Sequence, residues 1–424
     1  MIQALYTGVS GLQVSQRAMD VEGNNLSNLS TIGFRAQRVE FATLFDDAKN
    51  EVDPNGSIDS TVGIGSRVNA TTTDLSMGAL LDTESNTNLA IAGDGWFGVE
   101  DGNQRYFTRN GNFTFDVNRD LVMADSGMYV LGTIGKNINF NTQELTEEID
   151  AIPLEDIKQQ KKLRLPNTLT SPAKATEDTS FFGNLGTEDT TRVMSAKIYD
   201  VDGNTLKLKL TFTKAKEQPE QGIKWNVKAV LTTKEEKEGD PIYATSDGDV
   251  TFNEKGALTK STLTNIAYNG SNINIDLGKG FDGVTAIANV PVTASSKSDG
   301  HEKGELIGYE IAKDAEILAT FTNGRQSSVG RVGVFHFQND QGLNRISGSL
   351  FAESDNSGKA IIFKDQDGNN ILGASVLNKK LENSNVKIEN GLTQLIILQR
   401  SYQANGKIVT TADQMIQKAL NMDA

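Results

Sequence analysis

The chain has 424 residues, of which 37% are hydrophobic, so it can bury a sizeable core and divide into about two to four domains. Its formal net charge of −14, without an obvious basic stripe, argues against nucleic-acid binding and against binding to anionic membranes. The absence of cysteine excludes disulfides, thiolate metal sites and cysteine nucleophiles.

The first predicted element is a helix over residues 2–29 with apolar side chains at heptad spacing. This spacing makes one narrow stripe, the seam that two supercoiled helices share. The second set of seam positions, Ile2, Val9, Gln16 and Gly23, is half small or polar. We therefore expect the helix to be marginally stable alone and to need contacts with neighbouring elements. The predicted seam residues of this helix are Leu5, Val9, Leu12, Met19 and Leu26.

The start of the chain lacks a basic segment followed by an apolar run, and no apolar run in the chain is long enough to span a bilayer. We therefore expect no membrane insertion and no cleaved secretory signal. Residues 24–34 follow, where amides and hydroxyls compete for backbone hydrogen bonds and Gly33 can end the helix. Residues 29–75 are predicted to form an extended, irregular connector, together with residues 365–385.

From about residue 75 the period of the pattern changes to two, which predicts short strands separated by glycine-containing turns. A β-rich domain is expected over residues 76–165 with 298–364, and an inserted outer β-rich domain over residues 166–297. Three prolines and a basic run between residues 149 and 175 mark the crossing between them. The predicted strands lie at 89–91, 96–99, 106–108, 113–115, 193–199, 206–212, 225–231, 250–252, 273–277, 307–311, 317–321, 331–337 and 349–351.

The last predicted element is a second heptad helix near the end of the chain. A stripe at each extreme of the sequence is most simply explained if the two ends pair. The predicted fold is therefore mixed and mainly β, with paired, coiled-coil-like terminal helices, residues 1–28 with 386–424, enclosing two nested β-rich domains. The predicted seam residues of this helix are Ile388, Leu392, Leu395, Tyr402, Val409, Ile416 and Leu420.

No motif in the sequence carries chemistry. Residues 93–98, GDGWFG, match the spacing of a dinucleotide-binding loop, but a strand end and a turn follow where that loop needs a helix. Residues 200–204 and 365–369 have glycine at the fourth position rather than the sixth that a helix-flanked calcium loop requires. With only two histidines in the chain, we expect no catalytic, cofactor or metal site, and no enzyme.

Both ends of the chain resemble bacterial flagellar rod and hook proteins. The opening LYTGVSGL and NNLSNLSTIGFR segments and the closing QRSYQANGK and TTADQM segments are similar to the terminal signatures of that family, and GDGWF, YFTRNG, FTNGR, LPNTL and LENSNV are similar to hook segments. The length of the chain favours the hook over the shorter distal rod protein. The motif positions are Asn25, Asn28, Thr31, Gly33, Phe34, Gln399, Arg400, Gln403 and Asn405.

The resemblance implies a structural subunit that polymerises with itself into a curved, flexible tube, which couples rod to filament and transmits torque. It also implies an extracellular place in the flagellar hook, reached through the flagellar type III export apparatus without signal cleavage. The partners that it implies are the distal rod protein, the hook–filament junction protein and the hook cap.

Two other hypotheses remain at this point. A rod or hook-like junction paralogue of the same family would share both terminal signatures. A surface carbohydrate-binding or enzymatic module in residues 166–297 would suit the variable sequence and the many acidic groups of that region.

Overall fold

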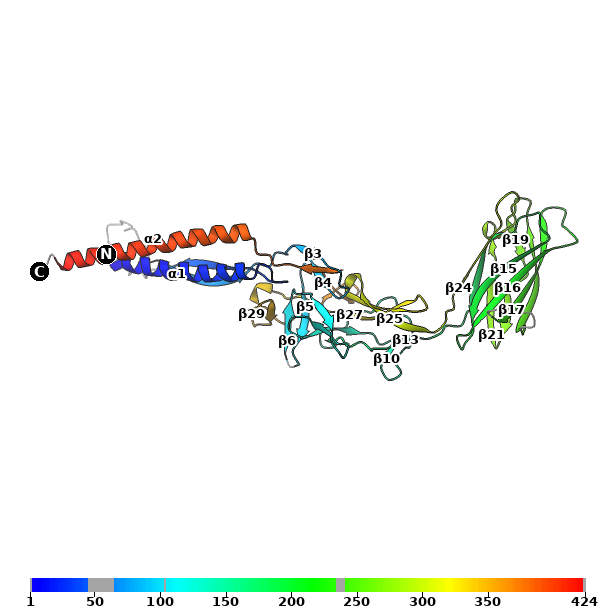
Figure 1. Ribbon diagram of the computed structural model, residues 1–424, viewed down its shortest axis with the longest axis horizontal. Coiled ribbons are helices and arrows are strands. Elements are labelled where there is room, and N and C mark those ends of the chain that lie inside the picture. Colours follow the sequence, from blue (N-terminus) through cyan, green and yellow to red (C-terminus); the bar gives the residue numbers. More distant parts are fainter. Residues whose placement is uncertain (1, 45–64, 103, 234–240, 422–424) are drawn as a thin grey trace.

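The computed structural model describes residues 2–44, 65–102, 104–233 and 241–421. The molecule is elongated, with a helical arm at one extremity, an inner β unit in the middle and an outer β unit at the other extremity (Figure 1). The arm contains segments from both ends of the chain, because α1 (Ile2–Ser27) and α2 (Ile388–Leu420) lie side by side. The prediction of paired terminal helices around a mainly β chain is therefore confirmed.

The helical arm also contains a hairpin that the sequence analysis did not predict. β1 (Gln37–Thr43) pairs antiparallel with β2 (Ser66–Thr73), with a bulge between Glu40 and Phe41, and both strands pack along α1. Residues 37–43 and 66–73 are thus regular strands rather than irregular connector, and residues 45–64 of the expected connector lie outside the described residues. The pattern hid the strands because most of their residues are polar or small, so neither shows a regular alternation of apolar and polar side chains.

The inner β unit is built from segments on both sides of the outer unit. Fifteen of its strands form one sheet system, in which β27 pairs with β9, β28 with β5 and β30 with β6. Two further pairs, β3 with β34 and β4 with β33, join early strands to late ones. These pairings confirm the predicted nesting.

The strands of the inner β unit before the outer unit are β3 (Leu80–Asp82), β4 (Leu89–Ala92), β5 (Trp96–Glu100), β6 (Arg105–Thr108), β7 (Phe113–Phe115), β8 (Leu121–Met123), β9 (Tyr129–Ile134), β10 (Ile138–Asn139), β11 (Glu144–Leu145), β12 (Lys161–Lys162) and β13 (Thr170–Ser171). Those after it are β25 (Gly304–Ile311), β26 (Glu316–Phe321), β27 (Gln326–Val332), β28 (Val334–Phe335), β29 (Asn344–Ser347), β30 (Leu350–Ala352), β31 (Phe363–Lys364), β32 (Asn370–Ile371), β33 (Ser375–Asn378) and β34 (Lys380–Glu382), with short 3-10 turns η1 (Lys313–Ala315) and η2 (Asp340–Gly342).

The GDGWFG segment, residues 93–98, forms the turn from β4 into β5 and the first residues of β5. Gly95 has φ 134°, and a Cβ on Gly98 would lie 2.3 Å from Cε2 of Phe335 on the pairing strand β28. The glycines are therefore needed for a tight turn and for a close ring contact. Their neighbours Trp96 and Phe97 are buried in the core.

The outer β unit has its own core between two sheets. One sheet has the order β20-β21-β14-β23-β22, with β24 beside β14, and the other has the order β15-β16-β17-β18-β19. Trp225, Phe181 and Phe212 lie in the core between them. The strands are β14 (Asp178–Asn184), β15 (Thr191–Tyr199), β16 (Thr205–Lys214), β17 (Ile223–Thr233), β18 (Ala244–Phe252), β19 (Leu258–Ser261), β20 (Asn265–Tyr268), β21 (Ser271–Asp276), β22 (Gly278–Lys279), β23 (Asp282–Thr285) and β24 (Thr293–Ser298).

Candidate functional site

The two terminal helices form an antiparallel pair. Near the middle of α1, the Oγ of Ser15 donates a hydrogen bond to the Oγ of Ser401 at 3.3 Å. Gly8, near the start of α1, faces Val409 near the end of α2, and Leu26, near the end of α1, faces Gly391 near the start of α2. Contacts therefore run along the whole length of α1.

The centre of this helix seam consists of small residues. Gly8, Ser15 and Ala18 are the buried positions of the first three-quarters of α1. A Cβ on Gly8 would lie 2.8 Å from Cγ2 of Val409, and one on Gly11 would lie 2.5 Å from Nδ2 of Asn405. Small side chains let the helix axes approach closely, since the distance between packed helices depends on the side chains at the contact.

Most of the large apolar residues predicted for the seam flank this small-residue line. Leu5, Leu12, Met19 and Leu26 are half-buried on α1, and Leu395, Val409 and Ile416 are half-buried on α2. Five of the predicted positions are exposed in the single chain, because the small residues occupy the closest contact, and their role in the seam or in assembly stays a prediction. These five are Val9, Ile388, Leu392, Tyr402 and Leu420.

α1 lies between α2 and the β1–β2 hairpin. The buried Asn25 ties the end of α1 to the start of β1, because its Oδ1 accepts from the Gln37 amide at 2.9 Å and its Nδ2 donates to the Gln37 carbonyl at 2.8 Å. Asn385, just before α2, accepts from the Ala36 amide at 2.7 Å and donates to the carbonyl of Asp74 at 2.8 Å. Two asparagines thus tie the hairpin to both helices.

The remaining motif positions near the end of α1 shape the turn into the inner β unit. Asn28 donates to the carbonyl of Asn24 and accepts from the Thr31 hydroxyl, and Phe34 is buried. Gly33 has φ 68°, and a Cβ there would lie 2.4 Å from the backbone nitrogen of Asn110. Glycine is therefore required both by the backbone conformation and by the close approach to the inner unit.

A buried ionic cluster joins the arm to the inner β unit. The Glu382 carboxylate is fully buried, with Oε1 2.7 Å from Nη1 of Arg35 and Oε2 3.4 Å from Nη1 of Arg109. Oε1 also accepts from the amide of Gly78 at 2.8 Å. Burial lowers the pKa of Arg109, and the neighbouring Arg35 lowers it further, against the opposing effect of Glu382.

This cluster connects the segment after α1, the hairpin strands of the inner unit and the segment before α2. Arg345 extends it, because Nη2 donates to the carbonyl of Arg35 at 2.9 Å and its guanidinium lies 4.4 Å from the ring centroid of Phe34. The cluster leaves no recognisable pattern in the sequence. Arg35 lies inside a terminal motif and Glu382 inside a segment similar to hook proteins, but nothing in a single sequence shows that these distant charges meet.

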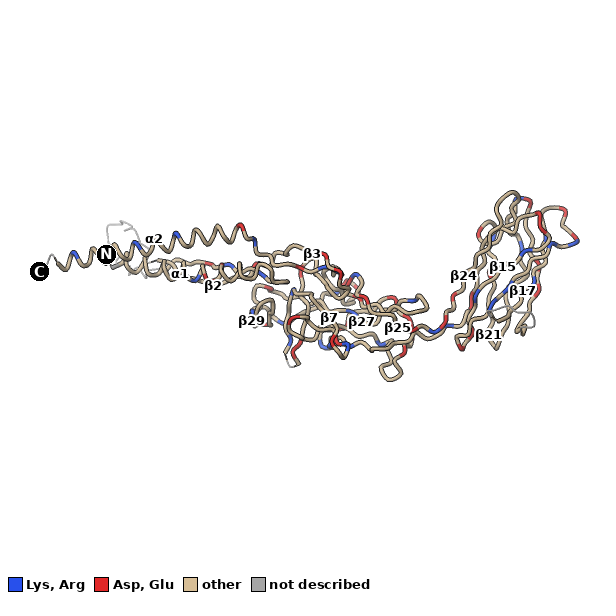
Figure 2. The backbone as a smooth tube through the Cα atoms, viewed as in Figure 1, with Lys and Arg blue, Asp and Glu red and all other residues tan. Residues whose placement is uncertain are grey.

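Few charged residues lie along α2 (Figure 2). Ile397 is 53% exposed and Ile408 is 43% exposed, and they are eleven residues, or about three helical turns, apart on one face. The family-motif residues Gln399, Arg400 and Gln403 are also exposed, and the Arg400 side chain donates to the Gln403 amide oxygen at 3.4 Å. α2 therefore presents a mixed apolar and amide surface that the single chain leaves uncovered.

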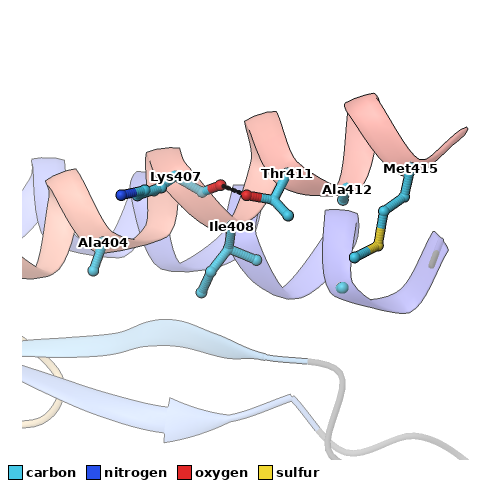
Figure 3. Close-up of a pocket in the computed structure, with 7 residues that line it drawn as sticks. Ala404, Lys407, Ile408, Thr411, Ala412 and Met415 are labelled. Atoms are coloured by element: carbon cyan, nitrogen blue, oxygen red, sulfur yellow. Dashed lines mark hydrogen bonds between the residues drawn. The ribbon is translucent and has the colours of Figure 1, made fainter. Parts of the chain in front are cut away.

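Part of this surface is a groove of about 500 Å³. The side chains of Ala404, Ile408 and Met415 point to the same side of α2, while the Thr411 hydroxyl turns back to the Lys407 carbonyl (Figure 3). Such a contiguous apolar groove is typical of a protein-interaction surface. Its lining residues are Ala4, Ala404, Lys407, Ile408, Thr411, Ala412 and Met415.

A second groove, of about 800 Å³, lies between α1, β1 and the start of α2. It is more polar, and its lining includes Glu22, Arg38 and Lys387. Asp74 at its edge pairs with Arg38 at 2.8 Å. Burial raises the pKa of Asp74, but hydrogen bonds from Ser76 and the charge of Arg38 outweigh burial and hold the pKa below its usual range.

No described residues form a cluster suited to a metal ion. In both aspartate-rich loops the first aspartate, Asp200 or Asp365, accepts hydrogen bonds from backbone amides two and four residues later, which is ordinary turn chemistry. His336 is buried and its Nε2 lies 2.6 Å from the carbonyl oxygen of Leu372. Among the helices in the described part of the chain, none has the length and apolar character needed to cross a membrane.

Four protein-family models match successive parts of the chain. They are described as flagella basal body rod protein, residues 5–35, flagellar hook protein FlgE/F/G D1 domain, residues 90–152, flagellar basal body protein FlaE D2 domain, residues 165–327, and flagellar basal body rod FlgEFG protein C-terminal, residues 378–422. The terminal models cover α1 and α2, so the matches begin and end on the helical arm.

Similar proteins span nearly the whole chain. The flagellar hook protein FlgE of Borreliella burgdorferi is 28% identical over 100% of both chains, and that of Salmonella typhimurium is 27% identical over 98% of both. The crystal structure of Helicobacter pylori flagellar hook protein FlgE2 has a TM-score of 0.53 at 15% identity, covering 72% of this chain and 100% of that one. This last likeness concerns the fold.

Proposed function

Because the chain belongs to the flagellar hook protein family and is a structural subunit of the hook, we propose that it polymerises through its helical arm into a curved, flexible tube that couples rod to filament and transmits torque. The observation that carries this proposal is the uncovered surface of α2. Its exposed isoleucines and its apolar groove would remain in water in a monomer. Burial of apolar area is the main driving force of protein association, and a second copy of the chain is the partner that a homopolymer supplies.

In this proposal the seam residues have two separate roles. The half-buried Leu12 and Leu395 stabilise the pair within one chain, whereas the exposed Val9, Leu392 and Tyr402 contact neighbouring copies. Contacts with neighbours also stabilise the arm, because anything that binds the folded form shifts the folding equilibrium. The arm therefore gains stability as the tube grows.

The finer partners and the route of export are also proposals. A subunit between rod and filament needs contacts with the distal rod protein at one end of the polymer and with the hook–filament junction protein at the other, and growth needs a cap. Export through the flagellar type III apparatus without signal cleavage requires an unfolded chain, and a helical arm that depends on assembly suits that requirement. The proposed domains are residues 1–28 with 386–424, 76–165 with 298–364, and 166–297; residues 29–75 with 365–385, which include β1, β2, β33 and β34, join the first two.

The test is a double charge substitution on the uncovered face of α2. We expect Ile397→Glu with Ile408→Glu to abolish tube formation, because two carboxylates would have to be buried in the contact without partners. Purified protein would be polymerised with ammonium sulfate and imaged by negative-stain electron microscopy. The matched control is Val117→Glu in the inner unit, where the side chain is already 95% exposed and tubes should form normally.

Circular dichroism of the unpolymerised variant should match that of the parent, since both isoleucines are exposed in the single chain. Normal tubes from the double variant would refute the proposal that this face of α2 carries assembly.

A further inference from the structure

The outer β unit is connected to the inner one by a narrow two-stranded segment, residues 171–177 with 299–304, here called the connecting ribbon (Figures 1 and 2). At its centre Lys174 and His301 exchange two backbone hydrogen bonds, both 3.0 Å long. So short a pair of strands is only marginally stable by itself. The direction in which the outer unit leaves the inner one must therefore depend on side chains at the two ends of the ribbon.

The outer end of the ribbon is fastened by Asp299. Its Oδ1 accepts from the amides of Glu177 at 2.9 Å and Asp178 at 3.0 Å, and its Oδ2 accepts from Nζ of Lys174 at 3.1 Å. Asp178 begins β14, so these bonds make this end of the ribbon part of the outer unit.

The inner end is fastened by Glu148, which lies in the loop after β11. Its Oε1 accepts from the buried Ser171 hydroxyl at 2.9 Å and lies 3.5 Å from Nε2 of His301, so it reaches both strands of the ribbon. Its Oε2 accepts from Nε of Arg325 at 2.9 Å and from Nη2 of the same side chain at 2.8 Å. Arg325 belongs to the turn between β26 and β27 of the inner unit.

The side chains of Glu148 and His301 are 16% and 12% exposed, so the carboxylate is largely shielded from water, although the Arg325 side chain is 54% exposed. Burial raises the pKa of Glu148, but the hydrogen bonds from Arg325 and Ser171 outweigh burial and hold the pKa below its usual range. The group is therefore a carboxylate at neutral pH, and charge-assisted hydrogen bonds of this kind are about twice as strong as neutral ones.

We propose that Glu148 is a positioning residue that holds the connecting ribbon against the inner β unit and so sets the angle between the two β units. Without it, the ribbon keeps its backbone pairing, the exposed pair of Lys303 with Glu144 and the hydrogen bond from Asn323 to the Glu302 carbonyl at 2.9 Å, but no buried charged contact, and the outer unit swings about Lys174 and His301. The contact of Glu148 with the ribbon forms within the single chain. Only its consequence for bending of a tube rests on the proposed function.

The test measures the distance between the two β units in the unpolymerised full chain. Because the parent has no cysteine, Val117→Cys in the inner unit and Glu254→Cys in the outer unit give two unique spin-label sites, both exposed. Double electron–electron resonance should give one narrow distance distribution in this background. With Glu148→Gln we expect the population outside that range to rise about tenfold, the factor expected for loss of one charged hydrogen bond.

The matched control is Glu144→Gln. Glu144 pairs with Lys303 of the same ribbon at 3.1 Å, but their side chains are 47% and 57% exposed, so the distribution should stay narrow. A second variant, Arg325→Gln, removes the other side of the contact at a side chain that is 54% exposed, and should broaden the distribution as Glu148→Gln does.

Tryptophan fluorescence separates loosening of the ribbon from unfolding, because Trp96 is buried in the inner unit and Trp225 in the outer unit. Both signals should stay native in the variants. A distribution in Glu148→Gln or Arg325→Gln that is as narrow as the parent's would overturn the proposal, as would equal broadening in Glu144→Gln. No tube is needed for the measurement, so a failure of assembly leaves its result unaffected.

Discussion

At the scale of single residues, the junction between arm and inner unit depends on Glu382. One carboxylate sits between two buried arginines, and Nε and Nη2 of Arg35 and Nε of Arg109 have no hydrogen-bond partner. Charges removed from water are tolerated only when they are paired. The junction is therefore more sensitive to loss of this carboxylate than to loss of any exposed ion pair nearby.

We expect Glu382→Gln to lower the free energy of unfolding of the inner unit by about 3–5 kcal/mol, because the substitution leaves buried guanidinium charge uncompensated. Urea unfolding followed by Trp96 fluorescence measures it, since the Arg109 guanidinium lies 5.6 Å from the Trp96 ring centroid. The control is Asp82→Asn, which removes the exposed pair of Asp82 with Lys380 and should cost less than about 1 kcal/mol. Similar losses in the two variants would contradict the prediction.

Asp120 gives a prediction about pH. Its buried carboxylate accepts two hydrogen bonds of 2.7 Å from Arg164. Burial raises the pKa of Asp120, but the hydrogen bonds and charge of Arg164 outweigh burial and hold the pKa below its usual range. A carboxyl whose folded-state pKa is depressed stabilises the fold above its unfolded-state pKa, and this stabilisation is lost as pH falls through the folded-state pKa.

We therefore expect the difference in unfolding free energy between the parent and Asp120→Asn to be constant from pH 7 to about pH 5 and to shrink below about pH 4. At neutral pH it should be about 1–3 kcal/mol, the cost of losing a hydrogen bond to a charged group. Urea titrations at pH 7, 5 and 3 with Trp96 fluorescence measure it. A difference that is the same at pH 3 as at pH 7 would show that the carboxylate charge contributes nothing.

At the scale of elements, the helix pair is defined by the small residues that let α1 and α2 approach. Gly8 and Gly23 both lie inside α1, but a Cβ on Gly23 would meet no atom within 4 Å, whereas one on Gly8 would press on the stiff side chain of Val409. Leucine has a higher helix propensity than glycine at both positions, but only at Gly8 would it change the packing between the helices. The same substitution at the two positions therefore separates the two effects.

We expect Gly8→Leu to weaken the pair by about 1–3 kcal/mol through overpacking, and Gly23→Leu to leave it intact. Ser15→Cys with Ser401→Cys supplies the readout, since the two hydroxyl oxygens lie 3.3 Å apart and the chain has no other cysteine. Disulfide formation under mild oxidation should slow about tenfold in Gly8→Leu. Equal rates in the two leucine variants would mean that the close approach at Gly8 is unimportant.

The stability of the β1–β2 hairpin depends on the helix that packs against it. Most of its residues are exposed or half-exposed, and an isolated two-stranded hairpin is marginal in water. α1 supplies the missing surface, and Asn25 supplies hydrogen bonds that extend the edge of β1. Local pattern could not predict it, because the stabilising surface lies elsewhere in the sequence.

At the scale of the whole molecule, the two β units have separate cores. Trp96, Phe107 and Phe335 belong to the inner unit, and Trp225 and Leu208 to the outer one. The connecting ribbon carries the only covalent links between them. Their unfolding should therefore be nearly independent.

We expect Leu208→Ala, in the core of the outer unit, to lower the stability reported by Trp225 by about 2–5 kcal/mol and to leave that reported by Trp96 unchanged. Urea unfolding of Trp96→Phe and Trp225→Phe backgrounds, each with one tryptophan, reads the two units separately. Parallel shifts of both transitions would mean that the units unfold as one.

Patterning predicted the terminal helices, the nesting and most of the longer strands, because heptad and period-two spacing are local properties of the sequence. The heptad rule ranks large apolar residues such as Leu12 and Tyr402 first, and so gives no weight to Gly8 and Ser15, which lie where the helices approach most closely. Patterning could not find the Glu382 cluster or the Glu148 contacts. Those depend on pairing between charges far apart in the chain, which the fold alone brings together.

The two ends of the outer β unit lie side by side, since Thr179 pairs with Ser298. A segment whose entry and exit points coincide can be deleted, enlarged or exchanged during evolution while the host around it keeps its connections. A short turn across the connecting ribbon would suffice to close the inner unit. Lineages can therefore remodel the exterior of this protein freely, while the arm and the inner β unit stay constrained by everything that packs on them.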